Sequence, residues 1–511
     1  MCENIEIICN FAKDKLHSAI CRMRKREHPD IMDIALPEDF INSTKAAFGD
    51  RLWAELASGL AAEAPVSIRL NPAKCRCDDV EITGSEGRVP WCEDGFYLKS
   101  RPNFTFDPML HAGLYYVQEA SSMFLDRVLR QYGGTAKTAL DLCAAPGGKS
   151  TVARTSLPAD CLLVSNEPIR TRAQILAENM QKFGNADVIV TNNYPEDFKR
   201  SGLAFDVVIA DVPCSGEGMF RKDAGAVKEW SLQNMEKCWR LQRGIVTDIW
   251  ECLKPGGLLV YSTCTFNTKE NEENVRFICE ELGAEVLSVE TSPDWRITGS
   301  LLGGFDRPVY RFLPGKTKGE GLFMAVMRKH GAAEERLRTP RKTKDKHKDR
   351  KQVRGVKGAS ADTTWLTAPE KFDIVQAGDT FMAVPQAWKD VYATAAKTLK
   401  ILSAGVVIGE AKGRDVVPSQ ALALSTSCNT SAFPTVGLDY RQALSYLRKE
   451  AVPLPEGTPR GYVLVTYKGV PIGFEKNIGN RANNLYPAEW KIKSTHTPET
   501  PNEIIRKKTT E

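Results

Sequence analysis

The middle of the chain alternates short apolar segments with longer amphipathic ones. Five short segments are rich in Val, Ile and Leu and have the length of buried strands: TALDLC, CLLVSNEP, ADVIVTNN, FDVVIADVP and GLLVYSTCT. The longer segments predict helices over residues 171–183, 232–253 and 270–282. Apolar strands separated by helices are typical of a parallel sheet that is covered on both faces. Residues 115–330 are therefore predicted to form an α/β domain with a doubly wound, Rossmann-like sheet.

The segment before this domain has a mixed pattern. It predicts one helix, over Asp39–Leu60, followed by short extended pieces at Val66–Asn71 and Gly95–Leu98. We therefore predict a small α+β unit over residues 31–114. Residues 1–30 are polar and are predicted to be an extension that precedes the folded units.

The segment after the α/β domain is apolar again over residues 361–493. It contains the extended runs ILSAGVVIGEAKG and GYVLVTYKGVPIGFEK, and the second run predicts a hairpin that turns at Lys468-Gly469. We predict a separate, β-rich C-terminal region here. The remaining residues, 494–511, are polar and are predicted to form a loose tail.

Composition narrows the class of protein. The chain has 511 residues, of which 42% are hydrophobic and 26% are charged, so it can hold about two to four globular domains. No run approaches the roughly 18 apolar residues of a membrane span, and the charged N-terminal segment does not resemble a signal peptide. The 14 cysteines are expected to be reduced thiols of a cytoplasmic protein. Because Cys75, Cys77 and Cys92 lack the paired spacing of a zinc site, no metal is expected.

The charge is concentrated in one segment. The chain carries a formal +5, whereas the 22 residues Arg336–Lys357 contain eleven Lys or Arg and two acids, which is +9. The rest of the chain is therefore close to −4. We interpret residues 331–360 as a basic linker, because this composition cannot bury enough apolar surface to fold. The linker is either a solvated tether or a sequence-independent contact with nucleic-acid phosphates.

A glycine-rich turn follows the first strand of the α/β domain. The run D-L-C-A-A-P-G-G-K-S-T begins at Asp141, and its Pro-Gly-Gly core lets the backbone turn tightly towards a ligand at a helix N-terminus. The dinucleotide pattern GxGxxG is absent, which disfavours a nicotinamide enzyme. The phosphate-loop pattern GxxxxGKS/T matches only at its end, because Cys143 stands where its first glycine belongs. A nucleotide hydrolase that binds triphosphate at Lys149 remains an alternative.

Two acids follow the first two strands. Asp141 ends the first strand and Glu167 ends the second. Neighbouring strands of a doubly wound sheet end at the same edge, where an acid can accept hydrogen bonds from both hydroxyl groups of a ribose. S-adenosylmethionine has such a ribose and no phosphates, so it fits this turn better than a nucleotide does. The alternative is that Glu167 is only a solvated acid at a helix N-terminus.

Two cysteines follow the last two strands. Cys214 comes after the fourth strand in D-V-P-C, and Cys264 comes after the fifth in Y-S-T-C, so both are expected at the cofactor edge. A thiolate that adds to C6 of cytosine makes C5 nucleophilic enough to take a methyl group, and a second thiol can assist product release. Asp211 would lie where it can hydrogen-bond the N3 and N4 edge of the base. Alternatively, both thiols are simple buried residues or form a disulfide.

Together these segments resemble a known family. The segments QEASSM, DLCAAPGGKST, NEP, DVPCSGEGMFRKD and STCTFNTKENEENV are similar to motifs of the Nop/Sun family of RNA cytosine-5 methyltransferases, over about residues 69–329. The resemblance implies a class I S-adenosylmethionine-dependent fold, with Cys264 as the nucleophile and Cys214 as the residue that helps to release the product. It also implies the following cofactor contacts: Cys143, Ala144, Ala145, Pro146, Gly147, Gly148, Lys149, Glu167 and Asp211.

The order of the domains narrows the resemblance further. A methyltransferase domain followed by a β-rich region is similar to the bacterial small-subunit ribosomal RNA methyltransferase F group, whose C-terminal domains are PUA-like; VLVTYKGVPIGFEKNIGNRANNLYPAEW resembles such a domain. The resemblance implies RNA as the partner, namely 16S ribosomal RNA or the small ribosomal subunit. We expect a monomer that binds neither DNA nor membranes. Arg221 and Lys222, which follow the Pro-Cys motif, are candidate phosphate contacts.

One position departs from the family pattern. The family has an acid after the third strand that holds the adenine side of the cofactor, whereas TNNYPEDF here offers Asn192, Asn193 and Tyr194. An Asn amide could replace the acid, and the sequence does not assign which. The departure leaves open a non-catalytic RNA-binding or ribosome-assembly factor that keeps the fold, although the presence of both Cys214 and Cys264 speaks against it.

Overall fold

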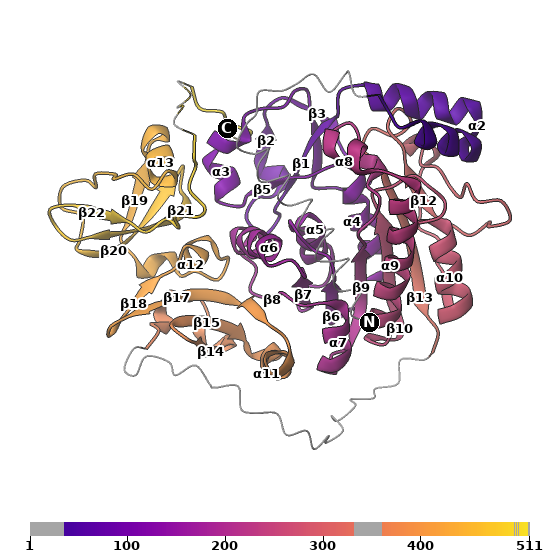
Figure 1. Ribbon diagram of the computed structural model, residues 1–511. Coiled ribbons are helices and arrows are strands. Elements are labelled where there is room, and N and C mark those ends of the chain that lie inside the picture. Colours follow the sequence, from indigo (N-terminus) through magenta and orange to yellow (C-terminus); the bar gives the residue numbers. More distant parts are fainter. Residues whose placement is uncertain (1–34, 332–359, 495, 497, 499, 509–511) are drawn as a thin grey trace, which may run out of the picture.

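The computed structural model describes residues 35–331 and 360–508, apart from residues 495, 497 and 499. The predicted N-terminal extension over residues 1–30 and the basic run Arg336–Lys357 lie outside the described residues. Figure 1 shows the N-terminal unit in indigo, the α/β domain in purple to salmon, and the C-terminal region in orange and yellow. Within the described part of the chain, no helix is long and apolar enough to cross a membrane.

A mixed sheet forms the centre of the α/β domain. Five strands run parallel in the order β10-β9-β6-β7-β8. Their bounds are β6 (Thr138–Asp141), β7 (Leu162–Asn166), β8 (Val188–Thr191), β9 (Phe205–Asp211) and β10 (Leu253–Thr263). The sheet continues beyond β10 with antiparallel strands, which are β13 (Leu322–Lys329), β11 (Ala284–Val286) and β12 (Tyr310–Phe312). The predicted doubly wound, Rossmann-like sheet is confirmed, and its antiparallel edge is an addition to the prediction.

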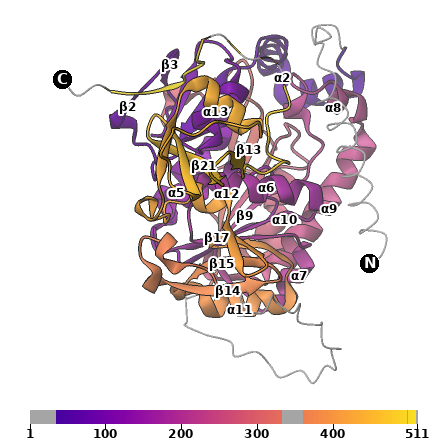
Figure 2. The same cartoon turned by 90° about the vertical axis from the view of Figure 1, so that its left-hand side faces the viewer.

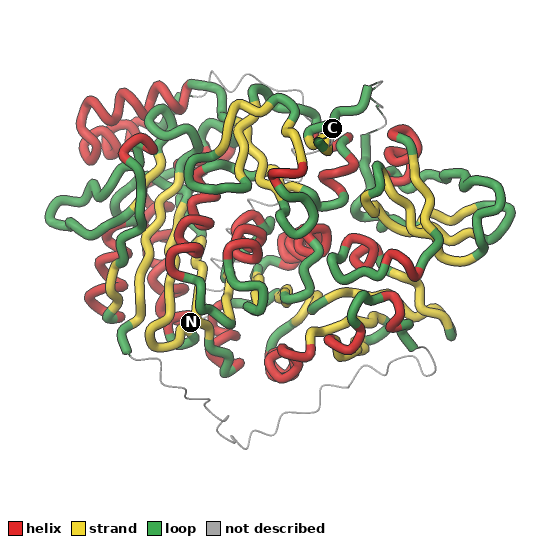
Figure 3. Tube along the Cα trace, turned by 180° about the vertical axis from the view of Figure 1, so that it is seen from behind, coloured by secondary structure: helices red, strands yellow, loops and turns green. Residues whose placement is uncertain are grey.

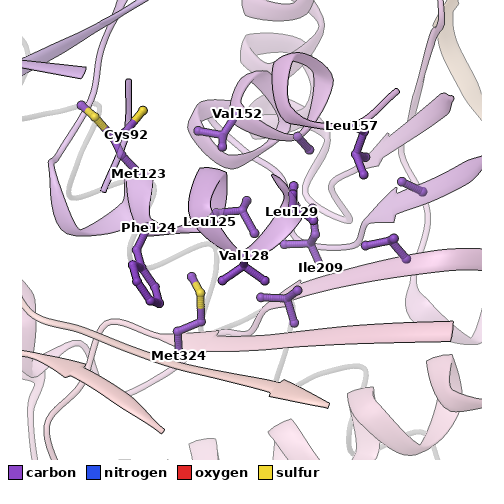
Figure 4. Close-up of a cluster of buried hydrophobic side chains, with 14 of the residues drawn as sticks. Cys92, Met123, Phe124, Leu125, Val128, Leu129, Val152, Leu157, Ile209 and Met324 are labelled. Atoms are coloured by element: carbon purple, nitrogen blue, oxygen red, sulfur yellow. The ribbon is translucent and has the colours of Figure 1, made fainter. Parts of the chain in front are cut away.

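Helices cover both faces of this sheet, as the view from behind shows (Figure 3). One face carries α4 (Phe124–Tyr132), α5 (Gly148–Ser156) and α6 (Arg170–Phe183). The other face carries α7 (Pro195–Ser201), α9 (Leu232–Trp250), which follows the short α8 (Ala224–Glu229), and α10 (Glu272–Leu282). Figure 4 shows the core under the first face, where Phe124, Val152 and Met324 belong to one buried cluster. Burial on both sides explains why the strands are apolar throughout.

The N-terminal unit combines a small antiparallel sheet with one long helix. Helix α2 (Glu38–Ala61) bends at Gly49, whose φ of 72° interrupts the helical backbone. The sheet has the order β3-β4-β1-β5. Its elements are β1 (Val66–Leu70), β3 (Ser85–Arg88), β4 (Gly95–Leu98) and β5 (Tyr115–Val117), and α3 (Pro108–His111) precedes β5. The helix and the extended pieces predicted for this α+β unit are present.

The C-terminal region contains two further sheets. The first consists of β14 (Phe372–Ala377), β15 (Thr380–Pro385), β17 (Val406–Lys412) and β18 (Asp415–Pro418), with α11 (Lys389–Thr398) and α12 (Gln420–Leu424). The second consists of β19 (Thr435–Leu438), β20 (Gly461–Tyr467), β21 (Val470–Asn477) and β22 (Ala482–Asn484), with α13 (Tyr440–Leu447). The predicted hairpin joins β20 to β21 and turns at Lys468 and Gly469, which both have positive φ.

The C-terminal region is not a separate body, contrary to our expectation. Strand β16 (Ile401–Ala404) pairs antiparallel with β8 and so extends the central sheet. The second C-terminal sheet also shares a core with the N-terminal unit, because Tyr446 and Ile472 lie in the same buried cluster as Ile68. Figures 1 and 2 show the yellow elements of this sheet beside the indigo to purple elements of the N-terminal unit, such as α3 and β2 (Val80–Ile82). Periodicity indicates strands but not their distant partners, which is why the sequence did not reveal these contacts.

The predicted loose tail contains a strand. Strand β23 (Ile505–Lys507) pairs antiparallel with β2 (Val80–Ile82) of the N-terminal unit. Ile504 and Ile505 are buried in the core that this unit shares with the C-terminal region. The prediction was wrong at this point because two adjacent apolar side chains can anchor a strand even within a polar segment.

Candidate active site

The turn after β6 leads the chain into α5 within a few residues. The N–H of Ala144 donates to the carbonyl of Asn166 on β7 at 2.8 Å, which holds the turn against the neighbouring strand. Gly147 has a φ of 118°, a conformation that residues with a Cβ rarely adopt, whereas Gly148 is helical and begins α5. The tight turn predicted from the sequence therefore depends on Gly147.

Side chains of α6 hold the carbonyl groups of this turn. Arg172 donates to the carbonyl of Ala145 at 3.0 Å, and the Asn179 amide donates to the carbonyl of Pro146 at 2.7 Å. These contacts lie outside the glycine-rich run, so the motif alone does not reveal them. The turn is thereby held in one conformation before any ligand binds, which lowers the entropy cost of binding.

Two buried carboxylates lie at the ends of β6 and β7, as predicted. Asp141 is fully buried; Ser150 donates to its Oδ2 at 2.7 Å, and its Oδ1 has no hydrogen-bond partner. Burial raises the pKa of Asp141 to about 7. Glu167 is also buried and accepts from the N–H of Ile169 at 3.0 Å, whereas its Oε2 accepts no hydrogen bond and lies 3.5 Å from Nη2 of Arg172 in an ion pair. Burial likewise raises the pKa of Glu167.

The two oxygens that accept no hydrogen bond, Asp141 Oδ1 and Glu167 Oε2, favour a ligand that donates hydrogen bonds. A buried carboxylate oxygen without a donor is costly, and a hydroxyl group that donates to it would remove this cost. The interpretation of Glu167 as a merely solvated acid is wrong, because only 1% of the residue is exposed. These two acceptor oxygens therefore fit the hydroxyl groups of the ribose of S-adenosylmethionine.

Lys149 and Asp211 form an ion pair beside the two acids. Their Nζ and Oδ2 atoms are 2.9 Å apart, and Ser262 on β10 donates to the other oxygen of Asp211 at 2.7 Å. Burial alone would lower the pKa of Lys149, but the charges of Asp211, Asp141 and the Cys264 thiolate raise it overall. Lys149 thus stays cationic and lies within electrostatic reach of Cys264.

The same charges disfavour the nucleotide hydrolase. A phosphate loop needs its lysine for the phosphate groups of the ligand. Here Lys149 is paired with Asp211, and Asp141 and Glu167 add further acid groups at this edge. A triphosphate placed among these acids would meet like charges at low dielectric, which is strongly unfavourable.

The two predicted thiols meet at the ends of β9 and β10. The register pairs Asp211 with Ser262, and the Sγ atoms of Cys214 and Cys264 are 3.3 Å apart. Neither cysteine forms a disulfide, and Cys214 is buried whereas Cys264 is partly exposed. The hydrogen bond to Cys264, followed by burial, raises the pKa of Cys214 well above its usual value. The two Sγ atoms thus share one hydrogen bond, and the raised pKa favours the protonated form of Cys214.

Glu217, which we did not single out from the sequence, fastens the two cysteine loops to each other. Its carboxylate accepts from the backbone N–H groups of Phe266 and Asn267 at 2.6 and 2.9 Å, just after Cys264. It also accepts from the indole of Trp230 at 3.0 Å. The residue follows Cys214 on the other loop and is buried, so it fixes the separation of the loops.

Glu270, which we also did not single out from the sequence, accepts hydrogen bonds from both cysteine loops. It accepts from the N–H of Ser215 at 3.0 Å and from the side chains of Gln242 and Asn267 at 2.7 and 2.9 Å. Burial, followed by the charge of Glu217, raises the pKa of Glu270 to about 7. Both acids occur inside the motifs, but glutamate is rarely buried, so its residue type gave no signal for this role.

Arg221 is not available as a phosphate contact, contrary to our expectation. Its side chain is only 5% exposed and donates to Glu320 at 2.7 Å and to the carbonyls of Gly319 and Gly59 at 2.6 and 3.0 Å. Lys222 is more exposed, but its Nζ lies 3.0 Å from Glu320. Two adjacent basic residues on a loop suggested exposed side chains that could contact RNA. Instead, Arg221 forms a buried ion pair with Glu320.

The residues at the end of β8 also have structural partners. The Asn192 amide donates to the carbonyls of Glu167 and Pro168 at 2.9 and 2.8 Å. The side-chain Oδ1 of Asn193 accepts from the backbone N–H of Lys400, which directly precedes β16, at 2.9 Å. Tyr194 is the residue before α7. The departure from the family pattern therefore lies where the C-terminal region docks on the central sheet.

The cysteines of the N-terminal unit take no part in this edge. Cys75 and Cys92 are buried and Cys77 is partly buried, and none of the three forms a disulfide. Among the residues that the structure describes, no cluster of three or more His, Cys, Asp or Glu side chains could hold a metal ion.

The fold and the site define a Rossmann-like methyltransferase domain with additional N-terminal and C-terminal units. A family model described as 16S rRNA methyltransferase RsmB/F matches residues 133–328. Models described as the N-terminal domain of 16S rRNA methyltransferase RsmF and as the methyltransferase RsmF PUA domain match residues 36–120 and 433–492. None of these three matches includes the first C-terminal sheet or β16.

Relatives along most of the chain agree with these matches. The protein named ribosomal RNA small subunit methyltransferase F of Shewanella loihica is 29% identical over 475 residues, which are 89% of this chain and 95% of the relative. Proteins of the same name in Shewanella baltica and Aliivibrio fischeri are 30% identical over 83% of this chain and 90% of each relative. The chain belongs to the ribosomal RNA small subunit methyltransferase F family.

One solved structure supports the fold. The crystal structure of PH0851 superposes with a TM-score of 0.51 at 23% identity and covers 57% of this chain and 66% of that chain. The likeness concerns the fold alone.

Proposed function

We propose that the protein transfers a methyl group from S-adenosylmethionine to C5 of a cytosine in 16S ribosomal RNA. The observation that carries the proposal is the pair of reduced thiols, Cys214 and Cys264, whose Sγ atoms lie 3.3 Å apart at one edge of the sheet. C5 of cytosine is too weak a nucleophile to attack a methyl group directly. A thiolate that adds to C6 makes C5 nucleophilic, so one difficult step becomes two easier ones.

The cofactor in this proposal binds along the edge formed by Cys143–Lys149, with its ribose at Glu167 and Asp141. Asp141 Oδ1 and Glu167 Oε2 support this position, because neither accepts a hydrogen bond and the ribose offers two hydroxyl donors. When bound, the cofactor supplies an electrophilic methyl group on its sulfonium. Asp211, paired with Lys149 at the same edge, supports the sulfonium side through its negative charge.

Cys264 is the proposed nucleophile. It is more exposed than Cys214, so a base can reach it, and the proposal makes the protonated Cys214 its hydrogen-bond donor. The cationic Lys149 stabilises negative charge on Cys264. The Cys264 thiolate forms a bond to C6, and the displaced electron pair makes C5 nucleophilic. C5 then takes the methyl group, and the cofactor leaves as S-adenosylhomocysteine.

Cys214 is the proposed base that releases the product. Once the sulfur of Cys264 is bonded to C6, the hydrogen bond that most strongly raised the pKa of Cys214 is lost. Cys214 can then give its proton to solvent and accept the proton of C5. The Cys264–C6 bond breaks as C5=C6 forms again, and Cys264 leaves as a thiolate. The net products are the methylated base, S-adenosylhomocysteine and one proton.

Asp211 has a second proposed role at the target base. Its side chain is 32% exposed, so a base that approaches Cys264 can donate its N4 amino group to it. The extruded cytosine would thus be held between a carboxylate at its N3 and N4 edge and the thiol at C6.

RNA is the proposed partner. The matches to the N-terminal and PUA domains of rRNA methyltransferases support RNA binding on both sides of the methyltransferase domain. We further propose that the chain acts as a cytoplasmic monomer. Light scattering of the protein alone and with RNA tests this: a mass of one chain is expected, and a stable dimer would contradict it.

The cysteine variants test the chemistry. Incubation with radiolabelled cofactor and 16S rRNA or small ribosomal subunits should yield 5-methylcytosine, and its absence on every RNA form would contradict the proposal. Cys264→Ala should abolish transfer, whereas Cys214→Ala should accumulate a covalent protein–RNA adduct that denaturing gels reveal. Cys279→Ala, which changes another partly exposed free thiol, is the control and should behave as the wild type does. An adduct in Cys264→Ala would reverse the two roles.

A further inference from the structure

Lys400 of the C-terminal region is bound to the end of β8 by its backbone. The N–H of Asn192 donates to the carbonyl of Lys400 at 2.9 Å, and the N–H of Lys400 donates to the side chain of Asn193 at 2.9 Å. These bonds begin the ladder in which β16 pairs with β8. They place Lys400 at the same sheet edge as the candidate cofactor site.

The side chain of Lys400 continues this contact towards Glu167. Its Nζ donates to the Oδ1 of Asn192 at 2.9 Å. The amide nitrogen of Asn192 donates in turn to the backbone carbonyls of Glu167 and Pro168 at 2.9 and 2.8 Å. A charged donor thus orients an amide that holds the backbone of the proposed ribose acid. Lys400 and Asn192 are 208 positions apart, so the contact crosses from one part of the chain to another.

The strand order indicates which end of the cofactor meets this contact. The methyl group must face Cys264, which follows β10, and the ribose is placed at Glu167, which follows β7. The parallel strands have the order β10-β9-β6-β7-β8. A ligand with its methyl group towards β10 and its ribose at β7 must extend its adenine towards β8. Asn192 and Lys400 stand at that end.

We propose that Lys400 and Asn192 position the adenosyl end of the cofactor site, so that docking of the C-terminal region strengthens cofactor binding. This inference rests on the proposed function. Both are positioning residues, because they act through the backbone of Glu167. Coupling of this kind is reciprocal, so the bound cofactor also strengthens the docking of β16. The C-terminal region then supports the cofactor site in addition to its proposed role in RNA binding.

The test is calorimetric titration of the full chain with S-adenosylmethionine. Lys400→Ala keeps the backbone bonds of β16 but loses the bond to Asn192, and its Kd should rise about three- to tenfold. Asn192→Ala should raise the Kd about tenfold or more, because the two carbonyls lose their donor. Lys400→Arg should restore most of the affinity. Lys389→Ala, which removes an exposed lysine paired with Asp373 inside the C-terminal region, is the control and should stay within about twofold.

Two further measurements separate positioning from a general loosening of the fold. The double variant Asn192→Ala/Lys400→Ala should bind no more weakly than Asn192→Ala alone, because Lys400 acts only through Asn192. The ligand 5′-methylthioadenosine lacks the amino-acid end, and its affinity should fall by the same factor as that of the cofactor in Lys400→Ala. Additive losses in the double variant, or wild-type affinity in Lys400→Ala, would overturn the inference. If the wild type itself binds no cofactor, the proposed function fails instead.

Discussion

The two ends of the candidate site are built in different ways. At the thiol end, Cys214 and Cys264 follow neighbouring strands, and the acid Glu217 on one cysteine loop holds the backbone of the other loop. At the adenosyl end, Glu167 is supported by Asn192, which is itself held by Lys400 from the C-terminal region. The chemistry is therefore built within one domain, whereas cofactor binding depends on two parts of the chain. Changes in the C-terminal region should affect binding without affecting bond formation.

The largest expected effect is at the thiol end. Glu217→Ala leaves the buried N–H groups of Phe266 and Asn267 and the indole of Trp230 without their acceptor. We expect a loss of about 3 kcal/mol in the free energy of unfolding, because each buried donor left unpaired costs on the order of 1–3 kcal/mol. Urea titration measures this loss.

A matched variant makes this prediction specific. Glu229→Ala removes an exposed glutamate from α8 and should change the free energy of unfolding by less than about 0.5 kcal/mol. Glu217→Ala should also abolish the covalent adduct in the Cys214→Ala background, because the loop after Cys264 is no longer held. Normal stability and normal adduct formation would show that Glu217 does not fasten the two loops.

The next effect concerns pH at the adenosyl end. Asp141 has a pKa of about 7, and a ribose hydroxyl that donates to it favours the ionised form. Cofactor affinity should therefore rise with pH and be about tenfold weaker at pH 6 than at pH 8. Calorimetric titration across this range measures the change. Asp141→Asn should remove the dependence, and an unchanged pH profile in that variant would exclude Asp141 as its source.

The raised pKa of Asp141 also predicts that stability changes with pH in the direction opposite to cofactor affinity. Its pKa in the folded protein lies above the ordinary value of 3.8, so the native state binds more protons than the unfolded state between about pH 4 and 7. The contribution of Asp141 to the free energy of unfolding therefore decreases as pH rises through this window, while cofactor affinity increases. Comparison of thermal unfolding of the wild type and Asp141→Asn at pH 5 and pH 8 checks the sign. The predicted sign would be contradicted if the wild type were less stable relative to Asp141→Asn at pH 5 than at pH 8.

The smallest expected effect is that of a change at the adenosyl end on bond formation at the thiol end. Lys400→Ala in the Cys214→Ala background should leave the yield of covalent adduct unchanged at saturating cofactor, because Lys400 does not contact the thiol end. At limiting cofactor the yield should fall in proportion to the weaker binding. Gel quantification at both concentrations measures this difference. A reduced yield at saturation would show that the two ends are not independent.

The sequence predicted the thiol end better than the adenosyl end. Cys214 and Cys264 were predicted together because both follow apolar strands and because parallel strands end at one edge. Lys400 gave no such signal, since it follows a helix, α11, far along the chain. The antiparallel pairing of β16 with β8 depends on tertiary packing that local periodicity does not encode.

Buried charges account for the other differences. Glu217 and Arg221 were visible in the motif, but an acid and a base in a loop are usually exposed, so their burial could not be predicted from residue type. The prediction of a loose tail was wrong for the opposite reason. The segment is polar on average, but its apolar residues Ile504 and Ile505 are buried. In each case a partner distant in sequence decided the environment of the residue.

The most direct test of the central claim is mass spectrometry of the adduct formed by Cys214→Ala with 16S rRNA. Protease and nuclease digestion should yield one modified peptide, in which Cys264 carries a cytidine nucleotide with one added methyl group. Fragmentation locates the modified sulfur. A nucleotide on any other residue, or the absence of an adduct when labelled methyl transfer by the wild type is intact, would contradict the assignment of Cys264 as the nucleophile.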